Sequence, residues 1–455
     1  MIKQLAKSES ALFWTGFHIA LGYLCILTPW FLILWFYFVL GTSAIPAFNK
    51  LGKGHIQGFT FMLSYLLGFE LLDRMAATSP FIPYEIGKYF LILFAFLGLL
   101  ISNKKASGIG IWMAILITPA ALYDFSGNRL FSDLIINFFG PLGLALGVAL
   151  WGKHRMSLQN VETILRLLWY TCLSALVFTF FKTPDFEDIN FSLRANFQAT
   201  GGHASNQVST ILGLGMFLSI YAWQSRLKFS GFRWGDAMIA TAFTFQGFLT
   251  FSRGGIMVGI VAILSIYILN TYFNRSNNKQ SRIPLSYLLL GGLLIYFAFQ
   301  QVDQISGGKL SLRYRGETVG TYTGNVEKDL NKITSGRATI LQEDLKLWSK
   351  YPLTGVGAGS SKYIRILGEQ KAAAHIEFSR LLAEHGVPGL IYFSLLLKMG
   401  LRLWRRKQSD VHRNILLVLY IIGLATSFHS AMRTYITPLL MSIAMVGFQE
   451  QKVKQ

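Results

Sequence analysis

The stretch WGDAMIATAFTFQGFLTFSRGGIMVGIVAILSIYILNTYF, residues 234–273, decides the fold because it holds two long apolar runs, Trp234 to Leu249 and Ile256 to Phe273. A helix needs roughly 20 apolar residues to cross the hydrocarbon core of a bilayer. Between the runs stands TFSRGG, Thr250 to Gly255, with an arginine where the hydrocarbon ends. The stretch therefore predicts two membrane-spanning helices with Arg253 at one membrane face.

The composition extends this prediction to the whole chain. Of 455 residues, 52% are hydrophobic and 14% charged, and the mean hydropathy is +0.43. This balance lies outside the usual range of soluble domains and predicts an all-α polytopic integral membrane protein. The two cysteines, Cys25 and Cys172, both lie in apolar runs. We expect them to be small core residues and not part of a disulfide or a metal site.

The formal net charge of +20 is explained by membrane topology. The cations are dispersed between apolar runs and are not gathered on one soluble module, so nucleic acid is not an expected partner. The basic N-terminus, MIKQLAKSES, leads into an apolar run without a clear cleavage pattern, and we expect it to be retained.

About 12–14 spans fit along the chain. Fourteen is the literal count, and twelve result if short neighbours pair as re-entrant or interfacial segments. The candidate spans are 11–28, 29–48, 55–72, 84–101, 107–123, 130–151, 160–181, 205–223, 234–250, 256–273, 284–302, 386–404, 414–430 and 436–449.

The distribution of Lys and Arg between loops predicts the orientation. One alternating set of loops and termini holds 21 of these cations, from Lys3 to Lys454, and the opposite short loops hold seven. Since Lys and Arg are enriched on the cytoplasmic side, the basic set and both termini are expected in the cytoplasm. The seven cations of the outer face are Arg74, Lys88, Arg129, Lys182, Arg194, Arg253 and Arg433.

One long polar segment, residues 303–385, is expected on the same outer face as Arg253. It divides the chain into a helix bundle at 1–302, a periplasmic loop subdomain with amphipathic helices at 303–385 and C-terminal transmembrane helices at 386–455. ATILQEDLKLWSKYP, from Ala338, has Ile340, Leu341, Leu345 and Trp348 at helical spacing and predicts an amphipathic helix on the membrane face.

Two further stretches follow this helix. LTGVGAGSS, residues 353–361, is either a turn whose backbone N–H groups meet an anion or a turn that needs positive φ angles. AAAHIEFSRLLAEHGVPGLIYF, residues 372–393, predicts a helix that returns to the membrane near Val387. His375, Glu377 and Arg380 would then lie one to two turns above the interface.

These pieces resemble the O-antigen ligase and Wzy-type polymerase superfamily of bacterial envelope glycosyltransferases. Four elements carry the resemblance, in order and on one face: SRGG at Ser252–Gly255, TSGR at Thr334–Arg337, YPLTGVGAGS at Tyr351–Ser360 and AHIEFSRLLAEHGVPG at Ala374–Gly389. Each motif alone is short, and the order and spacing make the match specific. It covers about residues 190–405.

The resemblance implies a GT-C-like bundle with one large, partly helical periplasmic loop, in the bacterial inner membrane. Such enzymes transfer a glycan from undecaprenyl diphosphate to an acceptor hydroxyl at the periplasmic face, with inversion and without a cofactor or metal. The implied partners are the lipid-linked donor, a lipid A-core or lipid-linked sugar acceptor, and membrane lipids. The implied catalytic residues are Arg253, Arg194 and His375, although ATGGHASNQVS after Arg194 departs from the family's usual Gly-rich run ending in Pro-Asn.

The chemistry of these side chains fits that role. A guanidinium is always charged and grips phosphate oxygens bidentately, which suits Arg253 and Arg194 to a diphosphate leaving group. Gly254 would allow close backbone approach to the donor. The alternative for Arg253 is a snorkelling interfacial anchor.

His375 is the expected base for the acceptor hydroxyl. It could instead hydrogen-bond a diphosphate oxygen, or be a simple surface residue of a helix. Glu377 is a candidate to orient His375, but residues two apart on a helix do not face each other.

The remaining candidates are assigned by position. Arg337 and Arg380 are candidates for donor phosphate or sugar, and the alternative for Arg337 is a salt bridge to Asp329 or Glu343. His203 and Asn206 are cap residues or acceptor contacts. No tight Asp, Glu and His spacing predicts a metal site, although the acidic run DFEDIN, residues 185–190, could bind a cation.

Other functions remain open at this stage. A polymerase that uses a second lipid-linked repeat unit as acceptor shares the same motifs. A lipid or sugar transporter would place charged or helix-breaking residues at mid-membrane in related halves, whereas the polar groups here gather at one face. A purely structural envelope protein would leave the arginines and histidine of that face unexplained.

Overall fold

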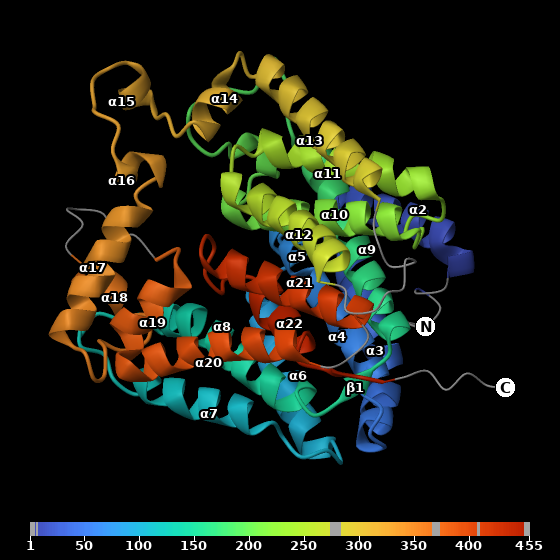
Figure 1. The fold of residues 1–455 in the computed structure, drawn as a ribbon, viewed down its shortest axis with the longest axis vertical. Coiled ribbons are helices and arrows are strands. Elements are labelled where there is room, and N and C mark those ends of the chain that lie inside the picture. Colours follow the sequence, from blue (N-terminus) through green and yellow to red (C-terminus); the bar gives the residue numbers. More distant parts are fainter. Residues whose placement is uncertain (1–4, 6–7, 274–283, 366–373, 407–409, 450–455) are drawn as a thin grey trace.

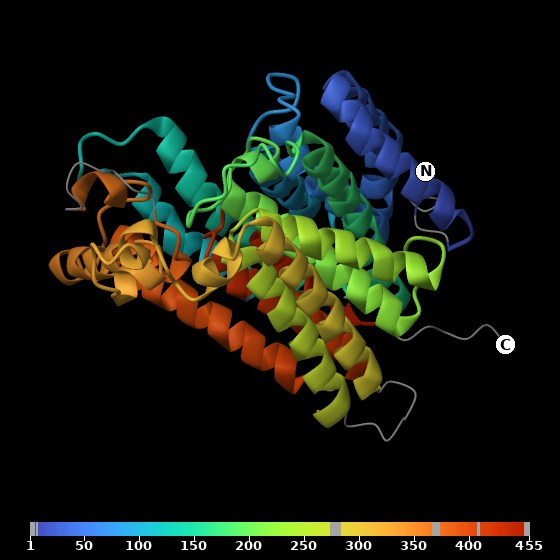
Figure 2. The same cartoon turned by 90° about the horizontal axis from the view of Figure 1, so that it is seen from above.

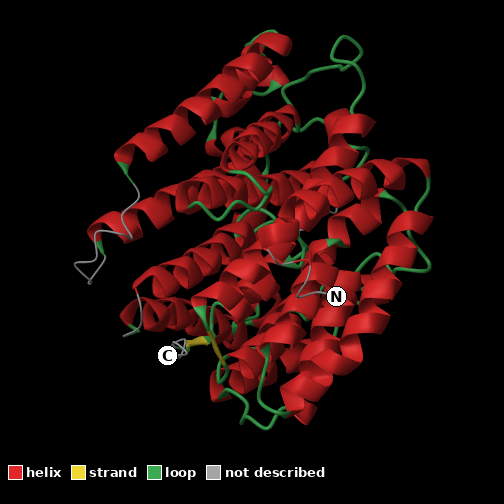
Figure 3. Cartoon of the chain, turned by 90° about the vertical axis from the view of Figure 1, so that its right-hand side faces the viewer, coloured by secondary structure: helices red, strands yellow, loops and turns green. Residues whose placement is uncertain are grey.

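The computed structural model describes residues 5, 8–273, 284–365, 374–406 and 410–449. Nearly all regular structure in these residues is helical (Figure 3). The strands β1 (Arg155–Met156) and β2 (Gly447–Phe448) form one short parallel pair, with Arg155 opposite Gly447. The expected loop cations Lys3, Lys7, Arg275, Lys279, Arg282, Lys407, Lys452 and Lys454 lie outside the described residues.

The first half of the chain forms the larger part of the bundle (Figure 1). Its elements are η1 (Ser8–Ser10), α2 (Ala11–Leu27), α3 (Trp30–Gly52), α4 (Gln57–Gly68), α5 (Glu70–Met75), α6 (Ile86–Ile101), α7 (Gly108–Ile117), η2 (Thr118–Ala121), α8 (Phe131–Trp151), α9 (Leu158–Lys182), η3 (Gln198–Thr200), α10 (Ser205–Ser225), α11 (Arg233–Leu249) and α12 (Arg253–Tyr272).

The second half adds a long helix, a group of short helices and three more bundle helices. These are α13 (Leu285–Ile305), α14 (Lys309–Tyr314), α15 (Val319–Tyr322), α16 (Leu330–Ile333), α17 (Arg337–Lys350), α18 (Ser361–Ile364), α19 (Glu377–His385), α20 (Val387–Arg405), α21 (Asp410–Ser427) and α22 (Ile436–Ile443).

The protein is an all-α polytopic membrane protein, as the composition predicts. Within the described ranges six helices are long and apolar enough to cross a membrane, namely α3, α8, α9, α12, α13 and α20, and four shorter segments are apolar. The candidate span 55–72 is divided into α4 and α5 at Phe69, and α22 has only eight residues. Cys25 and Cys172 are free and buried, as expected.

Backbone hydrogen bonds between the loops place them at two opposite ends of the helix bundle. Residues 102–107, 152–157 and 446–448 meet at the basic end, where Ser107 N donates to Ala149 O and Gly447 N donates to His154 O. Residues 118–130, 194–204, 250–253, 303–365, 374–386 and 428–435 lie at the other end, here called the long-loop end. Figure 1 shows α17 at the left edge of the molecule and β1 in its right half, and Figure 2 gives the view from above.

Glycines bring α10 and α12 into close contact at the long-loop end. A Cβ on Gly255 would lie 2.0 Å from the Ser209 carbonyl oxygen, and one on Gly213 would lie 2.0 Å from the Gly255 oxygen. Small residues allow such approach of membrane helices. Moreover α12 begins at Arg253, three residues before the apolar run at Ile256, so Arg253 and both glycines form the first turn of the helix.

The helix α17 of the long loop buries different side chains from those that its apolar spacing predicted. In α17 the buried side chains are Ile340, Asp344 and Leu347, whereas Leu345 is 38% exposed. The helix packs against α19, and its Asp344 forms a buried ion pair with Arg365, so its orientation follows this charge and not the apolar spacing.

The glycine-rich turn after α17 follows the second of the two expected alternatives. Gly355, Gly357 and Gly359 all have positive φ, between 67° and 98°. The backbone N–H groups of Val356 and Gly357 donate to Ala383 O and Glu384 O. These donors hold the turn against α19, so an anion-binding role for them is wrong.

Candidate functional site

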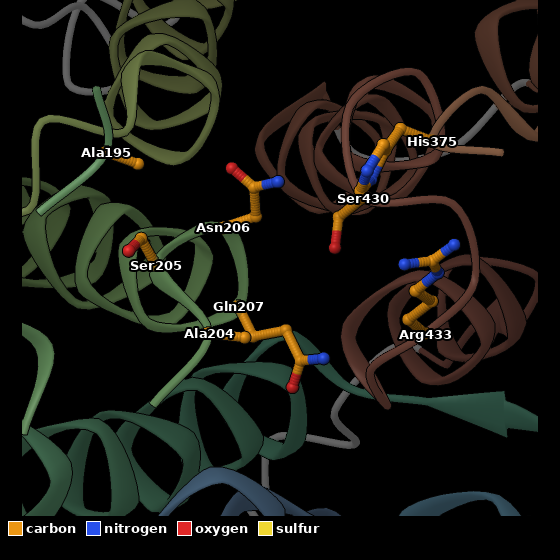
Figure 4. Close-up of a pocket in the computed structure, with 8 residues that line it drawn as sticks. All are labelled: Ala195, Ala204, Ser205, Asn206, Gln207, His375, Ser430 and Arg433. Atoms are coloured by element: carbon orange, nitrogen blue, oxygen red, sulfur yellow. The ribbon is translucent and has the colours of Figure 1, made fainter. Parts of the chain in front are cut away.

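A polar cavity of about 180 Å³ opens at the long-loop end. Two walls face each other across it in Figure 4. One is the start of α10, and the other is formed by the segment after α21 and the segment before α19. A water molecule takes about 30 Å³ of liquid volume, so the cavity has room for a phosphate-sized group. Its lining residues are Ala195, Ala204, Ser205, Asn206, Gln207, His375, Ser430 and Arg433.

His375 lies immediately before α19 and not inside it, because the helix begins at Glu377. The Ala431 N–H donates to the His375 carbonyl oxygen at 3.1 Å, which ties the two C-terminal segments of the wall together. The Nδ1 atom is buried and has no hydrogen-bond partner among the described residues. Residues 372–373 of the expected helix lie outside the described part of the chain.

The surroundings of His375 keep its ring neutral at ordinary pH. Burial is the largest cause, and the charges of Arg433 and Arg337 add to it, so the pKa of His375 falls to about 3. A neutral imidazole can accept a proton or a hydrogen bond. The same cations create a positive field that an anion in the cavity would neutralise.

Arg433 is the cation that lines this wall, beside the neutral ring of His375. One Nη atom donates to the Ala374 carbonyl oxygen at 2.7 Å, and Nε is buried with no partner among the described residues. Burial and then the Arg380 charge lower the pKa of Arg433. In the described part of the chain no carboxylate pairs with it, so its charge is available to a ligand.

The opposite wall is the first turn of α10. Asn206 accepts a hydrogen bond from the Ser252 hydroxyl at 2.9 Å, and Gln207 accepts one from Arg74 at 2.6 Å. Ser252 directly precedes Arg253, so this contact connects the cavity wall to the start of α12.

Arg253 reaches from α12 to the long loop. Its guanidinium donates to the backbone oxygens of Arg313 at 3.2 Å and Ile333 at 2.6 Å. Arg313 and Arg337 lie close enough for mutual repulsion: burial, then the Arg253 and Arg337 charges, lower the pKa of Arg313 to about 10. Three elements, α12, α14 and α17, thus contribute cations to one cluster.

Arg337 does not form the salt bridge considered as its alternative role. Glu343 pairs with Lys346 at 2.7 Å, and the Asp329 side chain caps α16 by accepting from Lys332 N. Among the residues that the structure describes, Arg337 forms no ion pair. Burial and then the Arg253 charge lower its pKa.

Arg380 and Glu377 have a different environment, in a buried charge network below the cavity. Arg380 pairs with Glu377 and, at 2.8 Å, with Glu384. Glu377 also accepts from Met432 N at 3.2 Å, which fixes the segment carrying Arg433. The sequence argument about Glu377 and His375 on one helix does not apply, since His375 precedes α19.

The remaining sequence candidates lie around the cavity. Arg194 is exposed, and it directly precedes Ala195, which lines the cavity. His203 lies 3.4 Å from the Tyr84 hydroxyl. Gly254 packs against His429, since a Cβ there would lie 2.6 Å from the ring. No group of three or more His, Cys, Asp or Glu in the described ranges is arranged as metal ligands.

Sequence reasoning did not select Gln207, Ser430, Arg433, Arg74 and Arg313 as site residues. Arg433 and Arg74 were recognised as outer-face cations, and this was the available signal. Nothing in the sequence pairs residue 74 with residue 207 or brings residue 433 beside residue 375, because these contacts arise from helix packing.

Part of the chain matches a known protein family. Residues 237–394 match the family model described as O-Antigen ligase. This segment is an O-antigen ligase family domain. No curated protein matches the chain. The match supports a membrane enzyme of the O-antigen ligase or polymerase type, with glycosyltransferase-like activity.

The family match covers one part of the cavity. It includes Arg253, Arg337 and His375, whereas Arg194, residues 203–207 and residues 430–433 lie outside it. Among the described lining residues, His375 alone lies in the matched segment, and the segments before and after the match supply the others.

Proposed function

We propose that the protein is an O-antigen ligase that transfers a glycan from undecaprenyl diphosphate to lipid A-core. The observation that carries this proposal is the cavity at the long-loop end, where Arg433 and the buried Nδ1 of His375 face the start of α10. A site with several donors, one cation and no carboxylate among its described lining residues suits a diphosphate.

The arginines would stabilise the leaving group. As the bond between the anomeric carbon and the diphosphate oxygen breaks, the electron pair leaves with undecaprenyl diphosphate and its negative charge grows. Fixed donors aimed at developing charge are the strongest single aid to such a step. Arg253, Arg337 and Arg433 would take this role, and Arg194 directly precedes the lining residue Ala195.

His375 would receive the proton of the acceptor hydroxyl as the new glycosidic bond forms. Its neutral state at ordinary pH permits this. The bound diphosphate would oppose the field of Arg433 and Arg337 and thereby raise the basicity of the ring when the donor is present. Direct attack by the acceptor inverts the anomeric centre, and no step of this scheme requires a metal.

The same proposal assigns the orientation. The basic loops would lie in the cytoplasm, with both termini, and the long-loop end in the periplasm. The enzyme would lie in the inner membrane with a GT-C-like bundle. The separation of basic loops from the cavity, at opposite ends of the bundle, supports this assignment.

The test uses His375→Ala and Arg253→Ala in a strain that lacks the native gene. Both should express at the normal level and leave lipid A-core without long glycan chains on a lipopolysaccharide gel. His55→Ala, an exposed histidine at the basic end, and Lys346→Ala, a cation that is 73% exposed, are the matched controls. Normal ligation by either site variant would contradict the proposal.

The deletion strain separates the ligase from the polymerase. A ligase defect leaves long polymer on the lipid carrier, whereas a polymerase defect leaves single repeat units attached to core. The second outcome would replace the ligase assignment with the polymerase.

A further inference from the structure

Two neighbouring amides, Asn206 and Gln207, line the cavity at the start of α10. A side-chain amide has one oxygen that accepts hydrogen bonds and one NH₂ group that donates two. What such a side chain offers to a ligand depends on which of the two ends is already engaged.

The partner of Gln207 fixes its orientation. Its Oε1 accepts from Arg74 Nη1 at 2.6 Å. A guanidinium has donors and no acceptor, so only the amide oxygen can face Arg74. The NH₂ group of Gln207 therefore faces the cavity, on the side of Arg433 (Figure 4).

Asn206 is arranged in the same way. Its Oδ1 accepts from the Ser252 hydroxyl at 2.9 Å. The amide nitrogen faces the cavity on the side of Ser430 and His375 (Figure 4). Both amides thus present donors to the space between the walls.

Arg74 is held by a buried charge network that leaves little freedom. It forms ion pairs with Glu70 and, at 3.3 Å, with Glu85, and its Nε donates to Tyr84 O at 2.9 Å. Glu70 in turn accepts from Tyr435 N at 2.6 Å. These partners engage Nε and Nη2 of Arg74, and Nη1 is the nitrogen that donates to Gln207.

The described residues that line the cavity include no carboxylate, whereas Arg433, His375 and the two amides contribute nitrogen atoms. A ligand that satisfies them needs several acceptor oxygens and negative charge, which is the chemistry of a phosphate group. Two substrates of the proposed reaction could carry it: the lipid diphosphate, or a phosphorylated lipid A-core acceptor.

We propose that Gln207 and Asn206 donate hydrogen bonds to phosphate oxygens in this cavity, and that Arg74 is a positioning residue that fixes the Gln207 amide. The inference rests on the proposed function, since it names binding groups of the same site. Neither Gln207 nor Arg74 lies in the segment that matches the O-antigen ligase family.

The decisive variant is Gln207→Glu. A glutamate keeps an oxygen for Arg74 and so preserves the fold of the network, but it replaces the donor with a charged acceptor. Hydrogen bonds to charged groups contribute about 1.5–3 kcal/mol, so binding should weaken about 10- to 100-fold. The matched control is Gln198→Glu. Gln198 is exposed, and its Oε1 accepts a hydrogen bond from the Asn190 backbone N–H.

Binding is measured on the full chain in nanodiscs with undecaprenyl diphosphate, inorganic pyrophosphate and a phosphorylated lipid A-core. Wild type and Gln198→Glu should bind alike, and Gln207→Glu should lose affinity at an unchanged thermal midpoint. A loss of affinity for undecaprenyl diphosphate and pyrophosphate identifies the lipid diphosphate as the ligand. A loss of affinity for phosphorylated lipid A-core alone identifies the acceptor phosphate. Unchanged affinity for all three would overturn the inference.

Two further variants keep the inference testable if Gln207→Glu does not fold. Asn206→Asp makes the corresponding exchange beside Ser252. Arg74→Lys keeps the charge beside Glu70 but supplies one nitrogen for four contacts, so Gln207 is released and its amide can rotate. Both variants should weaken binding of the same probe. In the double variant, the loss of affinity should be smaller than the sum of the losses from Gln207→Glu and Arg74→Lys alone. If wild type binds no probe and transfers no glycan, the proposed function itself fails.

Discussion

Arg380 and Arg433 are two largely buried arginines of the C-terminal part, and they differ in their partners. Arg380 is enclosed by the carboxylates of Glu377 and Glu384. Arg433 has one backbone contact and an Nε atom without a partner in the described ranges, and it lines the cavity. Both charges lie in low-dielectric surroundings, but only the second is left to be neutralised by a ligand. The comparison shows that carboxylate partners, more than burial, separate a structural cation from a ligand-facing one.

The largest effect is expected for Arg380→Met. It leaves Glu377 and Glu384 buried without their cation, which costs about 3–5 kcal/mol, a large part of a typical folding free energy. The protein should lose its monodisperse peak in size-exclusion chromatography and its normal thermal midpoint. A stable variant with normal thermal unfolding but no glycan transfer would instead place Arg380 among the ligand-binding residues.

The matched change Arg433→Met should act on catalysis. Removal of a preorganised donor to a developing oxyanion costs about 10²–10³ in kcat. The thermal midpoint should fall only slightly, because one hydrogen bond to Ala374 O is lost. The measurement is the rate of glycan transfer by purified protein beside its melting curve. If Arg433→Met unfolds as Arg380→Met does, the distinction between the two arginines is wrong.

The smallest effect concerns pH. With a pKa near 3, His375 stays neutral in the free enzyme from about pH 8 to pH 5. Loss of neutral imidazole should therefore lower kcat/KM less than about twofold over this range. A histidine with the ordinary pKa of about 6.5 would give a fall of roughly 30-fold. A steep fall near pH 6.5 in wild type, absent from Arg433→Met, would show that the cavity wall does not depress the pKa.

Several elements were predictable from local sequence. The apolar runs predicted the membrane helices, and the junction TFSRGG predicted that Arg253 lies at a helix end on the same side as the long loop. The helix α17 was expected from its spacing, but its face was not. Asp344 is buried there because Arg365, 21 residues further along the chain, supplies the opposite charge. Apolar periodicity does not show such a pairing.

The sequence by itself determined the all-α membrane class, the polar long loop and a set of cations on one side of the bundle. Only the tertiary structure decided which cations pair with carboxylates and which face the cavity, because Arg433 meets Ala374 and Arg74 meets Gln207 across separate helices. Hydrophobicity acts along each helix and is visible in one dimension. The environment of a charge depends on partners from distant segments, which helix packing alone brings together.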